Sequence, residues 1–190
     1  MVSAVVFLAD GSEEMELTII VDVLRRAGIQ VDVMGVQLDK DYAECSRGVK
    51  LMPDVLLEKQ QGNWSAAYDA AIIPGGLKGS RTLGANSKVQ QVLSSFYSQN
   101  KLVGFICAGT VVAKAAAIGQ GRRATSYPAF KDELSTYYDY SDDRVVVDGN
   151  FVTSRSPGTT FLFALTLVSK LVGQEISSRL QKEMLTTAKL

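Results

Sequence analysis

Cys107 stands at the end of an apolar run, and two small residues, Ala108 and Gly109, follow it. The run predicts a buried strand over 102–106, and the residues after it predict a helix over 111–117. A thiol on such a strand-to-helix turn is held away from the sheet, beside backbone N–H groups that the helix leaves free. The positive end of the helix dipole favours thiolate over thiol. We therefore expect Cys107 to be a reactive cysteine on a nucleophile elbow.

The chain contains no histidine. This absence excludes a Cys-His pair within the chain, and with it the usual peptidase and amidotransferase chemistry. Another group has to move the proton, and Glu16, in the first turn of a predicted helix, is the candidate. Gly75 and Gly76 end another predicted strand, where their backbone N–H groups could approach a ligand oxygen closely because no Cβ intervenes.

Predicted strands and helices alternate along the chain. Strands are expected over 3–9, 30–36, 68–73 and 102–106, with a hairpin over 144–154 and a short β excursion over 45–51; helices are expected over 13–27, 86–99, 111–117, 157–172 and 174–184. This order predicts one α/β domain over 1–190: a doubly wound, largely parallel, flavodoxin-like sheet sandwiched between helices. Ligands of such folds gather outside the carboxyl ends of the strands. Glu16, Gly75 and Cys107 should therefore meet at one rim.

Composition narrows the function classes. Twenty basic residues balance twenty acidic ones among 190, which gives no nucleic-acid-binding surface. No apolar stretch approaches the roughly 20 residues that span a bilayer, and the apolar N-terminus is expected to be a strand. Without histidine or clustered cysteines we expect no metal site. The two cysteines, Cys45 and Cys107, are far apart in sequence, which favours a reduced, cytoplasmic setting, and Cys45 is expected to be a buried packing residue.

Six segments in order along the chain resemble the ThiJ/PfpI superfamily, in the branch that contains the parkinsonism-associated deglycase-like protein and the glutathione-independent glyoxalases (glyoxalase III). The matching segments are Gly11-Ser12-Glu13-Glu14-Met15-Glu16, Val21-Asp22-Val23-Leu24-Arg25-Arg26-Ala27-Gly28, Cys45-Ser46-Arg47, Pro74-Gly75-Gly76, Ile106-Cys107-Ala108-Gly109 and Thr153-Ser154-Arg155-Ser156-Pro157-Gly158-Thr159. They extend over nearly the whole chain.

The resemblance implies roles for particular residues. It makes Cys107 the reactive cysteine and Glu16 its hydrogen-bonded acid. Gly76 and Ala108 become oxyanion-type N–H donors, and Arg47 is expected to reach toward a site in a homodimer. Two positions depart from the family pattern: Tyr127 stands where relatives often carry histidine, and Thr110 where some carry proline. Tyr127 is expected to pack or donate a hydrogen bond near the substrate, since a phenol is a poor proton shuttle at neutral pH.

The resemblance further implies a cofactor-free enzyme of the cytoplasm, and also of the nucleus, that converts methylglyoxal and related 2-oxoaldehydes to 2-hydroxy acids such as lactate. This is a lyase activity of the D-lactate dehydratase type, with protein deglycation as a side activity. The substrate-binding groups would be Gly75, Gly76, Ala108, Tyr127 and Arg47. An alternative remains at this point: a non-enzymatic sensor of oxidative stress, or chaperone-like protein, that works through oxidation of Cys107.

Overall fold

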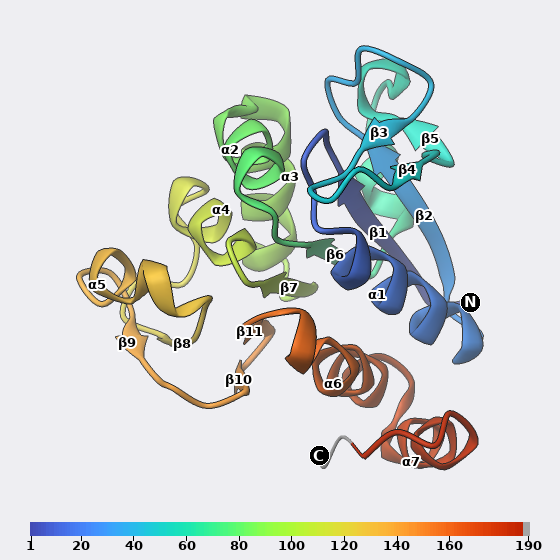
Figure 1. Ribbon diagram of the computed structural model, residues 1–190, viewed down its shortest axis with the longest axis vertical. Coiled ribbons are helices and arrows are strands. Elements are labelled where there is room, and N and C mark those ends of the chain that lie inside the picture. Colours follow the sequence, from blue (N-terminus) through green and yellow to red (C-terminus); the bar gives the residue numbers. More distant parts are fainter. Residues whose placement is uncertain (188–190) are drawn as a thin grey trace.

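A seven-stranded sheet runs through the middle of the molecule in this computed structural model, which describes residues 1–187 (Figure 1). The strand order is β10-β11-β7-β6-β1-β2-β5. All neighbouring pairs are parallel except β10 with β11, which form an antiparallel hairpin. The predicted doubly wound α/β fold with a largely parallel sheet is confirmed.

The elements alternate as the sequence pattern predicts. The strands of the sheet are β1 (Ser3–Leu8), β2 (Gln30–Gly35), β5 (Val55–Leu56), β6 (Ala70–Ile73), β7 (Leu102–Ile106), β10 (Val145–Asp148) and β11 (Phe151–Ser154). The helices are α1 (Glu14–Arg26), α2 (Leu77–Ala85), α3 (Ser87–Ser98), α4 (Gly109–Ala115), α5 (Lys131–Leu134), α6 (Thr160–Val172) and α7 (Gln174–Glu183). Two short ribbons lie outside the sheet, one of β3 (Ala43–Glu44) with β4 (Lys50–Leu51) and one of β8 (Arg123–Ala124) with β9 (Asp139–Tyr140).

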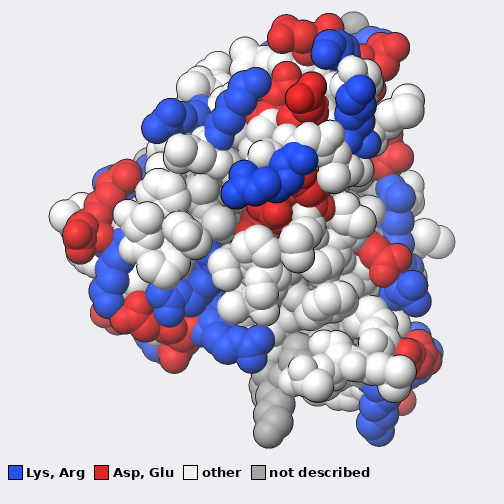
Figure 2. All heavy atoms as spheres, viewed as in Figure 1, with Lys and Arg blue, Asp and Glu red and all other residues white. Residues whose placement is uncertain are grey.

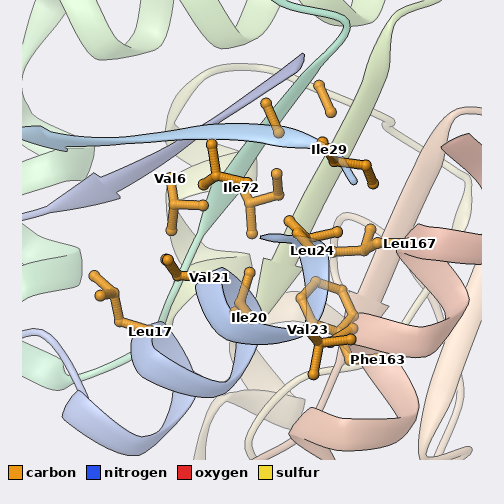
Figure 3. Packing of buried hydrophobic residues seen from close by; sticks show 14 of the residues in the cluster. Val6, Leu17, Ile20, Val21, Val23, Leu24, Ile29, Ile72, Phe163 and Leu167 are labelled. Carbon is orange, nitrogen blue, oxygen red and sulfur yellow. The ribbon is translucent and has the colours of Figure 1, made fainter. Parts of the chain in front are cut away.

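One face of the sheet is covered by α1 and α6, with α7 packed outside α6 (Figure 1). Figure 3 shows Ile20, Val23 and Leu24 of α1 meeting Phe163 and Leu167 of α6 beside the sheet. These side chains are fully or almost fully buried, so each stabilises the fold by about 1.5–3 kcal/mol relative to leaving it exposed. This contact fixes α1, and with it the acidic residues of its first turn.

At Gly104, α6 packs closely against the backbone of the sheet. This glycine lies in β7, and a Cβ added there would come within 3.1 Å of the Phe163 ring and 3.2 Å of Leu167. The missing side chain lets α6 approach the strand that ends at Cys107.

The opposite face is covered by α2, α3 and α4, and its core is a second cluster of buried residues. Phe105 and Phe151 contact each other there, with ring centroids 5.6 Å apart. Helix α2 was missing from the expected elements: it follows Gly76 directly and contains Gly79 and Gly84, which weaken a helical pattern. Because two of its nine residues are glycines, which have low helix propensity, the pattern of apolar residues did not predict this helix.

Helix α1 begins one residue after the predicted start at residue 13. The capping side chain is Glu13, whose carboxylate accepts a hydrogen bond from the Glu16 N–H at 2.7 Å. Ser12, the residue type that sequence rules favour as a cap, instead accepts a bond from the Ala9 N–H through its hydroxyl. The carboxylate of Glu13 therefore fixes the backbone of Glu16.

Helix α3 begins at a well-formed N-cap, Asn86, and the loss of this cap should lower the stability of the protein. The Asn86 side chain accepts hydrogen bonds from the N–H groups of Lys88 and Val89 at 3.0 and 3.1 Å. Replacing Asn86 with Ala should lower the free energy of unfolding by about 1 kcal/mol, because both N–H groups lose their acceptor. Asn63→Ala is the matched control, since Asn63 precedes a 3-10 turn and makes no such side-chain bond. Equal urea midpoints for the two variants would contradict this assignment.

Candidate active site

The carboxyl ends of β1, β6 and β7 bring Glu16, Gly75 and Cys107 into contact. The Gly75 N–H donates to Glu16 Oε2 at 2.6 Å. A Cβ added at Gly75 would lie 2.6 Å from both Glu16 Oε2 and Cys107 Cβ, and 3.0 Å from Cys107 Sγ. Only glycine fits between the carboxyl and the thiol. The three residues expected at one rim are thus direct neighbours.

Glu16 is an acid without exposed surface. Burial, together with the charge of Glu13, raises its pKa from 4.5 to about 8, although the hydrogen bonds from Gly75 and Cys107 act in the opposite direction. Within the described residues its Oε1 has no hydrogen-bond partner, so Gly75 supplies the bond that the other carboxyl oxygen accepts. The carboxyl is therefore protonated in most molecules at neutral pH.

Cys107 adopts a backbone conformation that non-glycine residues rarely take, with φ at +61°. Its N–H donates to the Ser154 carbonyl at 3.0 Å, which continues the pairing of β7 with β11. Its carbonyl accepts from the Tyr127 N–H at 3.4 Å. These two bonds hold the thiol-bearing turn between β7 and α4, and backbone strain of this kind is common at functional sites.

The expected lowering of the Cys107 pKa is wrong. Burial first, and then the charge and hydrogen bond of Glu16, raise the pKa of the thiol to about 12, although bonds from the Ala108 and Gly76 N–H groups act in the opposite direction. The prediction counted the helix dipole and left out desolvation, which spacing in a sequence does not reveal. Since each ionised group disfavours ionisation of the other, Glu16 and Cys107 titrate as one pair that holds a shared proton above neutral pH.

Two backbone N–H groups favour ionisation of the sulfur. Bonds from Gly76 and Ala108 lower the pKa of Cys107, and their role as oxyanion donors stays a prediction. Ala108 precedes the first residue of α4, and Gly76 precedes the first residue of α2, so both N–H groups belong to helix starts that leave them unpaired. Negative charge that develops beside the sulfur would be stabilised here.

Tyr127 lies next to this site through its backbone, by the bond to the Cys107 carbonyl. The residue is 44% exposed, and its ring meets that of Phe130 edge-on, with centroids 6.5 Å apart. The phenol therefore stands at the solvent side of the loop before α5, where it can meet a bound molecule.

Arg47 and Cys45 do not lie beside Cys107 and Glu16. Both line a cavity of about 610 Å³ between α2 and the β3–β4 ribbon, together with Lys78 and Arg81, and neither Cys107 nor Glu16 lines it. The Arg47 N–H donates to Glu14 Oε1 at 2.8 Å, and its side chain is exposed. Figure 2 shows basic and acidic side chains interspersed on this face of the molecule. The structure of one chain thus does not bring Arg47 to Cys107.

Cys45 is buried, as expected for a packing residue. Burial and then the Glu14 charge raise its pKa to about 11. Among residues 1–187 no three His, Cys, Asp or Glu side chains gather as metal ligands do, and no helix is long and apolar enough to cross a membrane.

The arrangement can be compared with known proteins. A model of the DJ-1/PfpI family matches residues 2–170, which include every residue of the site. The chain belongs to the DJ-1/PfpI family.

Relatives in the DJ-1/PfpI family cover almost the whole chain. Protein DJ-1alpha of Drosophila melanogaster is 44% identical over 98% of this chain and 85% of its own length. The protein named glutathione-independent glyoxalase DJ-1 of Schizosaccharomyces pombe is 34% identical over 97% of this chain and 98% of its own. The crystal structure of Drosophila melanogaster DJ-1beta superposes with a TM-score of 0.92 at 41% identity, covering 98% of both chains.

The buried Glu16 predicts a pH-dependent stability. Its native pKa of about 8 lies above the unfolded value of 4.5, so the native state binds more protons between these values and its stability falls as pH rises. Glu16→Gln keeps the acceptor for Gly75 and removes this loss. The variant should become more stable than the parent above about pH 4.5, with a gain on the order of 4 kcal/mol near pH 8.

Urea unfolding at pH 4, 6 and 8 measures this gain. Glu175→Gln, an exposed acid in the first turn of α7, serves as the control and should show no such trend. A Glu16→Gln curve parallel to that of the parent across pH would show that the carboxyl is not held protonated.

Proposed function

We propose that this DJ-1/PfpI protein is a glutathione-independent glyoxalase that converts methylglyoxal and related small 2-oxoaldehydes to 2-hydroxy acids, without a cofactor. One observation carries the proposal: a buried carboxyl and a thiol share one side of Gly75, with two helix-start N–H groups facing the sulfur. The name of the Schizosaccharomyces pombe relative supports the same chemistry. In classification terms the activity is that of a lyase of the D-lactate dehydratase type.

The reacting form is the pair after loss of its first proton. The remaining proton is shared, and in the tautomer in which Glu16 holds it, the Cys107 thiolate attacks the aldehyde carbon, a C–S bond forms, and the carbonyl electron pair moves onto oxygen. The Gly76 and Ala108 N–H groups stabilise that oxygen, which then takes the proton held by Glu16. The product is a neutral hemithioacetal beside an ionised Glu16.

The freed carboxylate then acts as the base. Glu16 removes the proton from the former aldehyde carbon, and the C–H electron pair forms an enediolate with its charge on the former ketone oxygen. That oxygen takes the proton of the neighbouring hydroxyl, and Glu16 returns its own proton to the carbon that bears that oxygen. This leaves a thioester on Cys107, which water cleaves to release the 2-hydroxy acid and restore the thiol. Methylglyoxal and one water thus become lactate, and no histidine is needed. The Tyr127 phenol can donate a hydrogen bond to the substrate from the solvent side.

Sensing through oxidation of the same thiol is the second candidate function. Oxidation proceeds through the thiolate, and the raised pKa of Cys107 leaves little of it at neutral pH. The same limit applies to turnover, but turnover also uses the buried Glu16 carboxyl, which protonates the new hydroxyl and then serves as base, whereas oxidation of the thiol has no use for it. We therefore favour turnover over sensing, and treat deglycation of proteins as a side reaction. The two free cysteines suit a reducing compartment, so we place the protein in the cytoplasm.

The shared proton predicts the pH profile of turnover. Lactate formation from methylglyoxal without added thiol should rise about tenfold per pH unit up to about pH 8 and then level, because the singly ionised pair reacts. Cys107→Ser should abolish turnover, and Glu16→Gln should lower it by roughly 10²–10⁴-fold. Cys45→Ser, the other thiol, is the control and should keep turnover. Unimpaired lactate formation by Glu16→Gln would remove Glu16 from the mechanism.

A homodimer would complete this site. Exposed apolar side chains lie on α1 and along the β3–β4 ribbon: Met15 is 55% exposed, Val49 49% and Met52 74%. The Glu14 carboxylate joins these two elements by bonds to Ser46 and Arg47. Burial of this face against a second copy would remove the apolar surface from water and could carry Arg47 toward the site of the partner.

Mixing two variants tests whether Arg47 serves the partner's site. Each variant, Cys107→Ser or Arg47→Ala, should form little or no lactate when it is assayed by itself. In a mixed dimer, the chain that keeps Cys107 faces a partner that keeps Arg47, so one of its two sites is intact. After unfolding and refolding an equal mixture, lactate formation should return to about a quarter of the parent rate. A mixture no more active than the mean of the separate variants, or a monomeric mass by light scattering, would refute the shared site.

A further inference from the structure

A buried hydroxyl-rich layer lies behind Cys107, at the ends of β7 and β11. Most of the buried polar side chains outside α1 that the structure describes gather here, on residues of three segments: Thr110, Thr125, Ser126, Thr153, Ser154, Thr159 and Thr160. Polar groups are expensive to bury unless they are hydrogen-bonded. Thr125 Oγ1 has no partner among the described residues, but the hydroxyls of the other six are bonded, and these bonds specify one arrangement of the segments around the thiol.

The first part of the layer ties the Tyr127 loop to the turn at Cys107. Thr110 Oγ1 donates to the Thr125 carbonyl at 3.0 Å, and the Thr125 N–H donates to Thr153 Oγ1 at 2.9 Å. Two residues later, the Tyr127 N–H reaches the Cys107 carbonyl. The loop is thus bonded to α4, to β11 and to the thiol-bearing residue itself.

The second part acts on Ser126, the residue between these anchors. Its carbonyl accepts hydrogen bonds from the Tyr140 hydroxyl at 3.2 Å and from Arg155 Nε at 3.4 Å. Its own hydroxyl lies 3.0 Å from the Tyr140 hydroxyl. Two side chains from β9 and from the end of β11 therefore converge on one peptide group next to Tyr127.

Arg155 is itself held in place. Its guanidinium donates to the Asp142 carbonyl at 2.6 Å and to Asp142 Oδ1 at 3.1 Å, and Lys131 pairs with Asp142 Oδ2 at 2.5 Å. The residue before Arg155 is Ser154, whose carbonyl accepts the Cys107 N–H. Arg155 therefore links both backbone bonds that restrain the Cys107 turn.

We propose that Tyr140 and Arg155 are positioning residues for Cys107, which act through Ser126 to hold the Tyr127 loop against the strained turn. Neither side chain needs to touch substrate. Their role rests on the proposed function for its effect on turnover, but the position of the thiol can be measured without it. The strained φ of Cys107 makes this restraint necessary, because the turn relaxes toward common backbone angles when its partners move.

Two variants test the proposal, with alkylation of Cys107 by iodoacetamide and lactate formation as separate readouts. Tyr140→Phe keeps the ring and removes the hydroxyl, and Arg155→Lys keeps the charge and loses the planar fork. The alkylation rate of the Cys107 peptide at pH 8, followed by mass spectrometry, should rise at least about threefold because the released sulfur is more exposed and more ionised. Turnover should fall about tenfold in kcat with KM changed less than threefold, since the reacting groups lose their alignment.

Tyr137→Phe is the matched control, because Tyr137 is close by in sequence and is not a partner of Ser126. It should leave both readouts unchanged. Alkylation rates within twofold of the parent in both Tyr140→Phe and Arg155→Lys would overturn the proposal, even if melting temperatures fall. If the parent chain makes no lactate, the glyoxalase assignment fails, while faster alkylation in the two variants still supports positioning. If one variant does not fold, the other decides.

Discussion

The structure is organised around the close approach of a carboxyl group and a thiol across a single glycine. Glu16 and Cys107 come from helices or turns at the ends of different strands, and Gly75 comes from a third. Without the parallel order of β1, β6 and β7 the three could not meet, because parallel strands end at the same edge of a sheet. The two helical layers then fix their distance, through α1 on one face and α4 on the other.

Burial of Glu16 and Cys107 lowers the stability of the native state, but it favours proton transfer between Glu16 and a reacting molecule. A carboxyl that is forced to keep its proton weakens the native state at neutral pH, yet the same confinement makes that proton available to a neighbouring reacting atom. The hydrophobic contacts of α1 with α6 supply stability that offsets this loss. The hydroxyl layer behind Cys107 has a different role in our proposal: it restrains the backbone conformation of Cys107, which would otherwise relax.

Local pattern was enough to predict most of this arrangement. The apolar runs predicted β1, β6 and β7, and the position of Glu16 and Cys107 beyond those runs predicted that they would share a rim. The ionisation state of Cys107 could not be predicted in this way, because desolvation depends on every element packed around the sulfur. Tyr140 and Arg155 were missed for a similar reason: their contact with Ser126 spans 14 and 29 residues, and no spacing rule signals it.

Gly104 shows how this architecture limits natural variation. It lies three residues before Cys107 and under Phe163 and Leu167, where the described atoms leave no room for a methyl group without movement. A replacement there makes the ends of the Phe163 and Leu167 side chains move by a few tenths of an ångström, and larger side chains press α6 away from the strand that carries the thiol. A change at a position that touches no substrate would then damage abundance and chemistry together, so genetic screens that sort variants by distance from the thiol would misjudge it.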